Sequence, residues 1–302
     1  MLDRRPLGSS GLLVSQIGFG GAAIGIDGYL VNERRSDEVI MNRAKDALMT
    51  ALDEGISLFD TAPGYGLGLS ERIFGATLAP YRPQIVLATK VKVEPGQGPA
   101  DWTRSVAASL ERLQTDYVDL LQLHGLAWSD DRADWVLREK VIDWLEGMRS
   151  CGWARAIGLT AEVPSGGLER LIDTRRFDVL QMAFSVIYQG ACDYQRAPFG
   201  PIPRAKALGM GVITMRAATS GVLQKLIHSE FPELDPNRIT KLALRFVLST
   251  PEVDSALIGM RLSSEVKVNA ALCRDGAARI DIRKLHDFFD GRSRNVEVRA
   301  DR

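Results

Sequence analysis

Four ionisable residues in the first half of the chain are of types that together can donate a proton to a carbonyl oxygen. They are Asp60, Tyr65, Lys90 and His124. Asp60, Lys90 and His124 each end a short apolar run, and Tyr65 lies in the segment directly after Asp60. Any one of them alone is usually a solvated or packed residue. Burying a carboxylate, an ammonium and an imidazole together is costly unless the groups pair or do chemical work, so the set predicts an active site.

The residue types suggest a division of labour. An ion pair between Lys90 and Asp60 would hold the ammonium in place. An ammonium beside a phenol favours phenolate and lowers the pKa of Tyr65 toward the working range. Tyr65 would then protonate a carbonyl oxygen as hydride arrives, and His124 would hydrogen-bond the same oxygen. None of the four side chains carries a hydride, so an external cofactor is required.

The apolar runs that position these residues recur eight times, and polar stretches with helical periodicity lie between them. The runs are 16–20, 57–60, 85–90, 117–124, 154–160, 178–183, 211–216 and 255–260. Eight strand-then-helix units predict a closed (β/α)₈ barrel, whose active site lies where strands end. The glycine-rich segment 18–25 has the wrong spacing for a Gly-x-Gly-x-x-Gly fingerprint, and no helix pattern follows it, which disfavours a Rossmann domain.

Local signals place several further elements. Segment 5–15 reads as a hairpin with its turn at 8–11. Helices are predicted over 37–54, 101–113 and 236–249, the last beginning at an Asp-Pro pair typical of a helix start. Apolar residues on one face of the first helix are Val39, Ile40, Ala44, Ala47, Leu48, Ala51 and Leu52. Without a linker-like tract, one domain over 1–302 is expected.

Composition narrows the classes of function. Basic and acidic residues balance at 38 each, which gives no reason to expect a nucleic-acid or anionic-membrane partner. The three cysteines, Cys151, Cys192 and Cys273, form no C-x-x-C pair and favour a reducing cytoplasm. No apolar stretch resembles a signal peptide or a membrane span. A cytoplasmic enzyme with a small-molecule carbonyl or alcohol substrate is expected, and no pattern indicates its oligomeric state.

These residues and their spacing resemble the aldo-keto reductase family over nearly the whole chain. The most specific segment is FDTAPGYGLGLSERIFGATL (59–78), and ATK and LQLHG support it. The resemblance implies a (β/α)₈ barrel closed at its bottom by the N-terminal hairpin. It places the family's catalytic tetrad on Asp60, Tyr65, Lys90 and His124 without substitution, and we use "tetrad" for these four residues below.

The resemblance also implies a nicotinamide dinucleotide extended across the top of the barrel. Gly21 and Asp60 lie on its expected path. Thr160 replaces the family's usual serine at the carboxamide, and the following Ala161 cannot replace the usual asparagine. Gln181 matches the family's carboxamide-binding glutamine. Where the family has an aromatic residue and a serine after strand seven, this chain has Met215 and Arg216. Methionine can cover a ring face, and Arg216 is either a pyrophosphate ligand or a solvated rim residue.

The segment after strand eight bears on the choice between NADP(H) and NAD(H). The family commonly reads Gly-x-Arg-x-x-x-Gln-x-x-x-Asn, and this chain has Gly259, Arg261, Glu265 and Asn269. Arg261 is expected to pair with a 2′-phosphate, which favours NADP(H). A carboxylate at Glu265 would repel that phosphate or accept a ribose hydroxyl, which keeps NAD(H) as the alternative.

The substrate is expected to be a small sugar or a sugar-like carbonyl compound, because GLGLSER resembles sugar dehydrogenases of the family, some of which use NAD. Tyr29 and Trp128, on loops after the first and fourth strands, are candidate walls of its pocket. A second hypothesis is a nucleotide-sensing regulatory subunit with little catalysis, which the intact tetrad disfavours. A metal-dependent hydrolase is a third, disfavoured by only three histidines and no His-x-His pair. No metal is expected.

Overall fold

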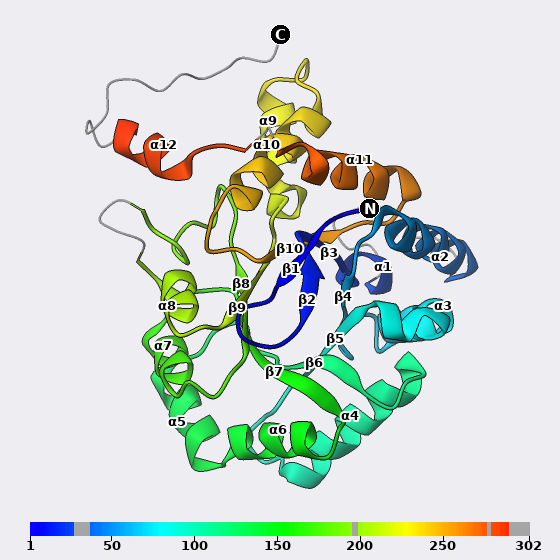
Figure 1. The fold of residues 1–302 in the computed structure, drawn as a ribbon, viewed down its shortest axis with the longest axis vertical. Coiled ribbons are helices and arrows are strands. Elements are labelled where there is room, and N and C mark those ends of the chain that lie inside the picture. The colour runs from blue at the N-terminus through cyan, green and yellow to red at the C-terminus, as the bar shows by residue number, and fades with distance from the viewer. Residues whose placement is uncertain (27–36, 195–198, 277–278, 290–302) are drawn as a thin grey trace.

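Eight parallel strands close into a barrel in the order β10-β3-β4-β5-β6-β7-β8-β9 (Figure 1). The computed structural model describes residues 1–26, 37–194, 199–276 and 279–289. The strands are β3 (Ile17–Gly20), β4 (Leu58–Asp60), β5 (Val86–Val91), β6 (Val118–Leu123), β7 (Ala154–Ala161), β8 (Val179–Ala183), β9 (Gly211–Met215) and β10 (Ser255–Gly259). Each coincides with one of the eight apolar runs, so the predicted (β/α)₈ barrel is confirmed.

Helices surround the barrel (Figure 1). They are α1 (Ala22–Gly25), α2 (Asp37–Glu54), α3 (Leu69–Leu78), α4 (Pro99–Leu113), α5 (Asp130–Arg138), α6 (Val141–Ser150), α7 (Gly166–Asp173), α8 (Pro201–Ala207), α9 (Val222–Glu230), α10 (Pro236–Leu248), α11 (Ser263–Arg274) and α12 (Ile282–Phe289). The described residues also contain two 3₁₀ turns, η1 (Ala79–Gln84) and η2 (Thr219–Gly221).

All three predicted helices are present. The first has the predicted bounds, the second begins two residues early at Pro99, and the third ends one residue early at Leu248. Asp235 caps the third helix, because its side chain accepts a hydrogen bond from the Asn237 backbone N–H. One expectation was wrong in detail: Val39 is exposed, outside the buried face of α2. The single helical turn α1 lies within the glycine-rich segment 18–25 itself.

The N-terminal hairpin closes the bottom of the barrel, as predicted. Strands β1 (Arg4–Pro6) and β2 (Leu13–Ser15) pair antiparallel and lie across the middle of the ring of strands (Figure 1). Gly8 has a φ of +54°, and a Cβ there would lie 2.2 Å from the backbone N of Gly211, so only glycine fits this contact. The hairpin and the lower barrel share one apolar cluster: Leu7, Leu12, Val14, Leu58, Val86, Ala88, Leu120, Ala156, Val179, Ile213 and Leu257.

The interior of the barrel changes from apolar to polar along its axis. Alternate strands contribute an apolar layer consisting of Leu58, Leu120, Val179 and Leu257. Two residues further along the same strands come Asp60, Gln122, Gln181 and Gly259. Because side chains on a strand alternate with a period of two, the second set lies directly above the first. The polar layer is thus at the carboxyl ends of the strands, where the active site is expected.

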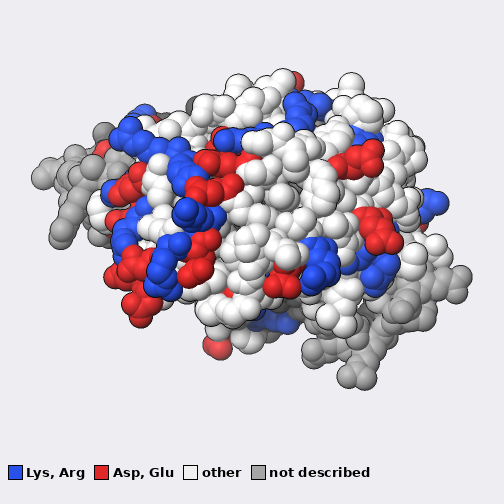
Figure 2. All heavy atoms as spheres, turned by 90° about the horizontal axis from the view of Figure 1, so that it is seen from below, with Lys and Arg blue, Asp and Glu red and all other residues white. Residues whose placement is uncertain are grey.

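Charges of both signs are mixed on the molecular face shown in Figure 2, without a continuous field of one sign. Ion pairs join neighbouring outer helices, for example Arg170 with Asp134 and Arg204 with Asp173. Within the described ranges, no helix is long and apolar enough to cross a membrane. The same ranges contain no group of three or more His, Cys, Asp or Glu residues arranged to hold a metal ion.

Candidate active site

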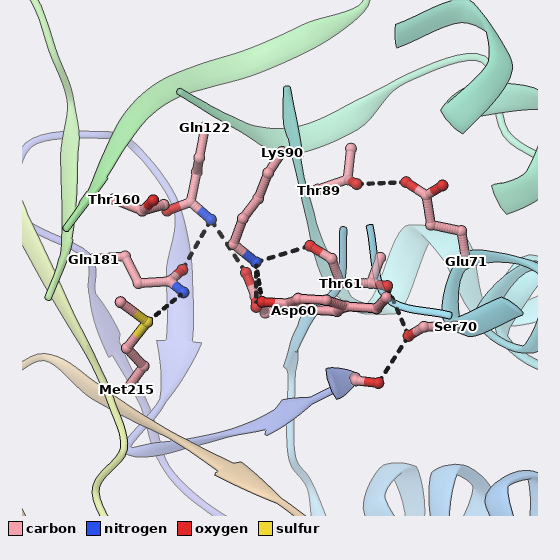
Figure 3. A network of polar contacts seen from close by, with 12 residues as sticks. Asp60, Thr61, Ser70, Glu71, Thr89, Lys90, Gln122, Thr160, Gln181 and Met215 are labelled. Atoms are coloured by element: carbon pink, nitrogen blue, oxygen red, sulfur yellow. Dashed lines mark hydrogen bonds and ion pairs between the residues drawn. The ribbon is translucent and has the colours of Figure 1, made fainter. Parts of the chain in front are cut away.

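Lys90 lies at the centre of the site and contacts both Asp60 and the Tyr65 hydroxyl. Its Nζ donates to Oδ2 of Asp60 at 2.6 Å and to the carbonyl oxygen of Thr61 at 2.8 Å (Figure 3). The Tyr65 hydroxyl oxygen lies 3.4 Å from the same Nζ. Strands β4 and β5 are neighbours in register, so their carboxyl ends bring Asp60 and Lys90 together. The predicted ion pair is therefore present, with the phenol beside it.

The ion pair is fully buried, and its partners determine its charge state. Burial lowers the pKa of Lys90, but the charges of Asp60 and Tyr65 and their hydrogen bonds raise it more, so the net pKa lies above its usual value. Lys90 therefore stays an ammonium. Burial raises the pKa of Asp60, and this outweighs the lowering by Lys90, Gln122 and Gln181. The carboxylate needs each of these donors because charge is costly to bury.

His124 follows β6 and faces Tyr65 across the rim. Its backbone N–H donates to the carbonyl oxygen of Val91 at 2.8 Å, which continues the sheet to the active-site edge. The rings of His124 and Tyr65 are perpendicular, at 88°, with centroids 6.3 Å apart. Burial first, then the charges of Lys90 and Lys92, lower the pKa of His124 to about 3. The imidazole is thus neutral at ordinary pH, and one ring N–H can donate to a carbonyl oxygen.

Gln122 was missed by the sequence analysis although it lies among these groups. Its Nε2 donates to Oδ1 of Asp60 at 3.1 Å and to Oε1 of Gln181 at 2.9 Å (Figure 3). The side chain is completely buried. The period of two along β6 was the available signal, because Gln122 precedes His124 by two positions and must point into the same barrel interior.

Residues 16–238 match the model of the Aldo/keto reductase family. This chain belongs to that family. It is 30% identical to an L-galactose dehydrogenase of Arabidopsis thaliana, over 89% of this chain and 88% of that protein. It is also 30% identical to an NADH-specific methylglyoxal reductase of Escherichia coli, over 62% of this chain and 60% of that one. The fold matches an aldo/keto reductase from Klebsiella pneumoniae solved with NADP and acetate, at 22% identity and a TM-score of 0.72, covering 97% and 98% of the two chains.

Family membership confirms the predicted resemblance and, with it, an oxidoreductase that uses a nicotinamide cofactor. The residues beneath the expected nicotinamide position fit such a group. Nε2 of Gln181 donates to the Met215 sulfur at 3.7 Å, and because sulfur is a weak acceptor, a carboxamide oxygen would be a better partner. Met215 ends β9 at the same edge.

In this aldo-keto reductase, Arg216 and Glu162 form an ion pair that was not predicted from the sequence. The Arg216 Nη2 lies 2.6 Å from Oε1 of Glu162, and the two residues follow strands β9 and β7. Arg216 has a φ of +59°, an uncommon conformation for a side chain of this size. The guanidinium is partly exposed and paired with this carboxylate, and its two predicted roles, pyrophosphate ligand or solvated rim residue, stay predictions.

Thr160 and Trp128 together hold the loop that follows His124. The Thr160 hydroxyl accepts from the Gly125 N–H and donates to the Gly125 carbonyl, both at 3.0 Å. Nε1 of Trp128 donates to the carbonyl oxygen of Thr160 at 2.8 Å. Trp128 is 1% exposed, so it has almost no surface for direct contact with a substrate, and its observed role is to support this loop. The other proposed pocket wall, Tyr29, lies outside the described residues.

Gly21 has a packing role in addition to the predicted cofactor role. Its N–H donates to the carbonyl oxygen of Asp60 at 2.7 Å, and its own carbonyl accepts from the Ser70 hydroxyl at 3.0 Å. A Cβ at Gly21 would lie 2.5 Å from that hydroxyl. Ser70 also accepts from Thr61 at 2.7 Å (Figure 3), so the SER segment of α3 holds the backbone around Asp60.

The remaining cofactor candidates lie along one loop and the start of α11. Gly259 ends β10, and Asn269 lies further along α11 and is largely buried. Oε2 of Glu265 accepts from the backbone N–H of Arg261 at 2.6 Å and from that of Leu262 at 3.1 Å. Glu265 therefore caps the helix, and its negative charge is partly balanced by helix-terminal N–H groups.

Proposed function

We propose that this protein interconverts a small sugar or sugar-like aldehyde or ketone with its alcohol, using NADP(H), with Tyr65 as general acid and base. One observation carries the proposal: a buried ammonium, Lys90 Nζ, is anchored on Asp60 at 2.6 Å and lies 3.4 Å from the Tyr65 hydroxyl. Such an arrangement stabilises the phenolate that remains after Tyr65 gives up its proton.

In the reducing direction, the proton of the Tyr65 hydroxyl moves to the substrate carbonyl oxygen, and the phenolate left behind is stabilised by Lys90. A nicotinamide cofactor, held in part by Gln181 and Met215, would supply the hydride that the carbonyl carbon receives. The neutral imidazole of His124 donates a hydrogen bond to the same oxygen and so fixes its position. Oxidation runs through the reverse proton transfer, from the alcohol to the Tyr65 phenolate.

The preference for NADP(H) rests on Arg261 and on the engagement of Glu265. A guanidinium at the start of α11 provides the charge and geometry that a 2′-phosphate prefers. The carboxylate of Glu265 accepts two backbone N–H groups, so it is turned to the helix end and opposes a phosphate less than a free carboxylate would. This favours NADP(H), while the name of the Escherichia coli relative shows that NADH-specific members occur.

The sugar-like substrate class is supported by the GLGLSER segment and by the name of the Arabidopsis relative. The proposed contacts with the substrate are Tyr65 and His124 at the carbonyl, with Tyr29 as a wall. Trp128 does not contact the substrate in this proposal. Its buried ring packs against Gly125 and donates to Thr160, and so supports the loop that follows His124.

The test compares the wild type with Tyr65→Phe on a panel of aldoses, methylglyoxal and aromatic aldehydes, with NADPH and NADH. We expect measurable turnover of the wild type and a loss of at least about 100-fold in kcat for the variant, the usual size of a general-acid contribution. Tyr81→Phe, on η1 outside the barrel, is the matched control and should retain activity. Full turnover by Tyr65→Phe would refute the catalytic assignment. Nucleotide binding without turnover of any substrate would instead favour a nucleotide-sensing subunit.

A further inference from the structure

The side-chain amide of Gln122 bridges Asp60, the partner of Lys90, and Gln181. The bridge runs from Lys90 to Asp60, from Asp60 to Gln122, and from Gln122 to Gln181 (Figure 3). Gln181 in turn reaches the sulfur of Met215. One chain of hydrogen bonds thus crosses the barrel from the proton donor to the side where the cofactor ring is expected.

The direction of every bond in this chain follows from the charge on Asp60. A carboxylate only accepts hydrogen bonds, so the atom of Gln122 that faces it must be the amide nitrogen. The second N–H of the same nitrogen then points to Gln181, whose oxygen must turn to receive it. The amide nitrogen of Gln181 is left pointing toward Met215, as a donor. Reversing Gln122 would set its oxygen against the carboxylate.

We propose that Gln122 is a positioning residue that couples the two halves of the reaction site. One of its N–H groups fixes the carboxylate that anchors Lys90, and the other fixes the Gln181 amide as a donor beneath the cofactor. This inference rests on the proposed function and deepens it. The carbonyl oxygen of Gln122 is buried and has no hydrogen-bond partner within the described part of the chain, so the residue is held by donation alone.

The variant Gln122→Leu removes both N–H groups while filling similar space. Oδ1 of Asp60 then loses a donor, so its pKa rises further above the usual value, and Asp60 takes up a proton at a higher pH. The titratable groups facing Asp60 are Lys90 and Tyr65, and His124 is neutral. We therefore expect the acid limb of kcat to move to higher pH. The dissociation constant of NADPH should rise about 3- to 10-fold as Gln181 loses its orientation.

Ser255→Ala is the matched structural control. It removes a buried hydrogen bond on β10, from the Ser255 hydroxyl to the backbone carbonyl oxygen of Ser15 at 2.8 Å, whose acceptor does not titrate. It should lower stability without moving the acid limb or the NADPH dissociation constant. Gln122→Glu sets a second carboxyl group opposite Asp60, so it should move the acid limb further in the same direction as Gln122→Leu.

A readout that needs no turnover separates this proposal from the proposed function. The loss of thermal stability in Gln122→Leu should grow as pH rises through the ionisation of Asp60. The reason is that the ionised carboxylate needs the Gln122 N–H donor more than the protonated carboxyl group does. The loss in Ser255→Ala should be independent of pH, because the acceptor it frees is a backbone carbonyl. If the two variants behave alike in stability and in NADPH affinity, Gln122 only fills space and the proposal is overturned. Absence of turnover in the wild type would refute the proposed function, and the stability and binding measurements would still decide the role of Gln122.

Discussion

Lys90 and Asp60 form a buried ion pair, 2.6 Å long, in which neither side chain is more than 4% exposed. Such a pair adds little net stability, because desolvation offsets attraction, but breaking it leaves a buried charge without compensation. Its value to this protein is therefore positional: it keeps an ammonium beside the Tyr65 hydroxyl.

Asp60→Asn should damage both activity and stability. Without the carboxylate, the pKa of Lys90 is no longer raised, so the alkaline limb of kcat should begin at lower pH. The uncompensated ammonium should cost about 3–5 kcal/mol in the free energy of unfolding. Denaturant melts and pH–rate profiles measure both effects.

The double variant Asp60→Leu with Lys90→Met should recover most of the stability without activity. Asp116→Asn, on the surface, should change neither stability nor activity. A double variant that remains as unstable as Asp60→Asn would contradict the charge argument.

His124 should make the fold less stable in acid. Its pKa of about 3 in the folded protein lies below the usual 6.5, so between these values the unfolded chain binds a proton that the folded protein excludes. Stability from this residue is therefore fully present above pH 6.5 and is lost as pH falls toward 3. His124→Gln should reduce the slope of unfolding free energy against pH in this window by about 1.4 kcal/mol per pH unit. Identical slopes in the two proteins would show that the imidazole titrates normally.

Arg261 should discriminate between the two cofactors. Arg261→Ala should weaken NADPH about 10- to 100-fold, the range for a charged hydrogen-bonded pair, and leave NADH unchanged. Glu265→Gln keeps an oxygen to cap α11 while removing its charge, so it should tighten NADPH. Fluorescence titration with both nucleotides measures these constants. Equal weakening of both by Arg261→Ala would rule out a 2′-phosphate contact.

Arg216 offers a complementary test, because the pyrophosphate is common to both cofactors. If its guanidinium leaves Glu162 to bind that group, Arg216→Ala should weaken NADPH and NADH by the same factor, and Glu162→Gln should tighten both. The Arg216–Glu162 pair is partly exposed, so either change should alter stability by less than about 1 kcal/mol. Unchanged affinities in both variants would identify the pair as a rim contact.

Much of the architecture is readable from local pattern. The eight apolar runs, the Asp-Pro helix start at 235–236 and the hairpin turn are short-range signals, and each appears at its predicted place. The positions of the tetrad residues could also be predicted from short-range signals. Asp60, Lys90 and His124 each end a run, and the carboxyl ends of parallel strands must share one edge.

The sequence by itself determined which strands form and which ionisable side chains stand at their carboxyl ends, and therefore the proposed proton donor and its ammonium. Only the tertiary structure decided which side chains meet across the barrel. Gln122 finds Asp60 and Gln181 because closure sets three alternate strands in one layer. Glu162 pairs with Arg216 because the loops after β7 and β9 approach each other. In the same way, the path of the loop after β6 packs the Trp128 ring against Gly125. The physical reason is range: periodicity and capping act over a few residues, whereas these contacts join residues that only the closed barrel brings together.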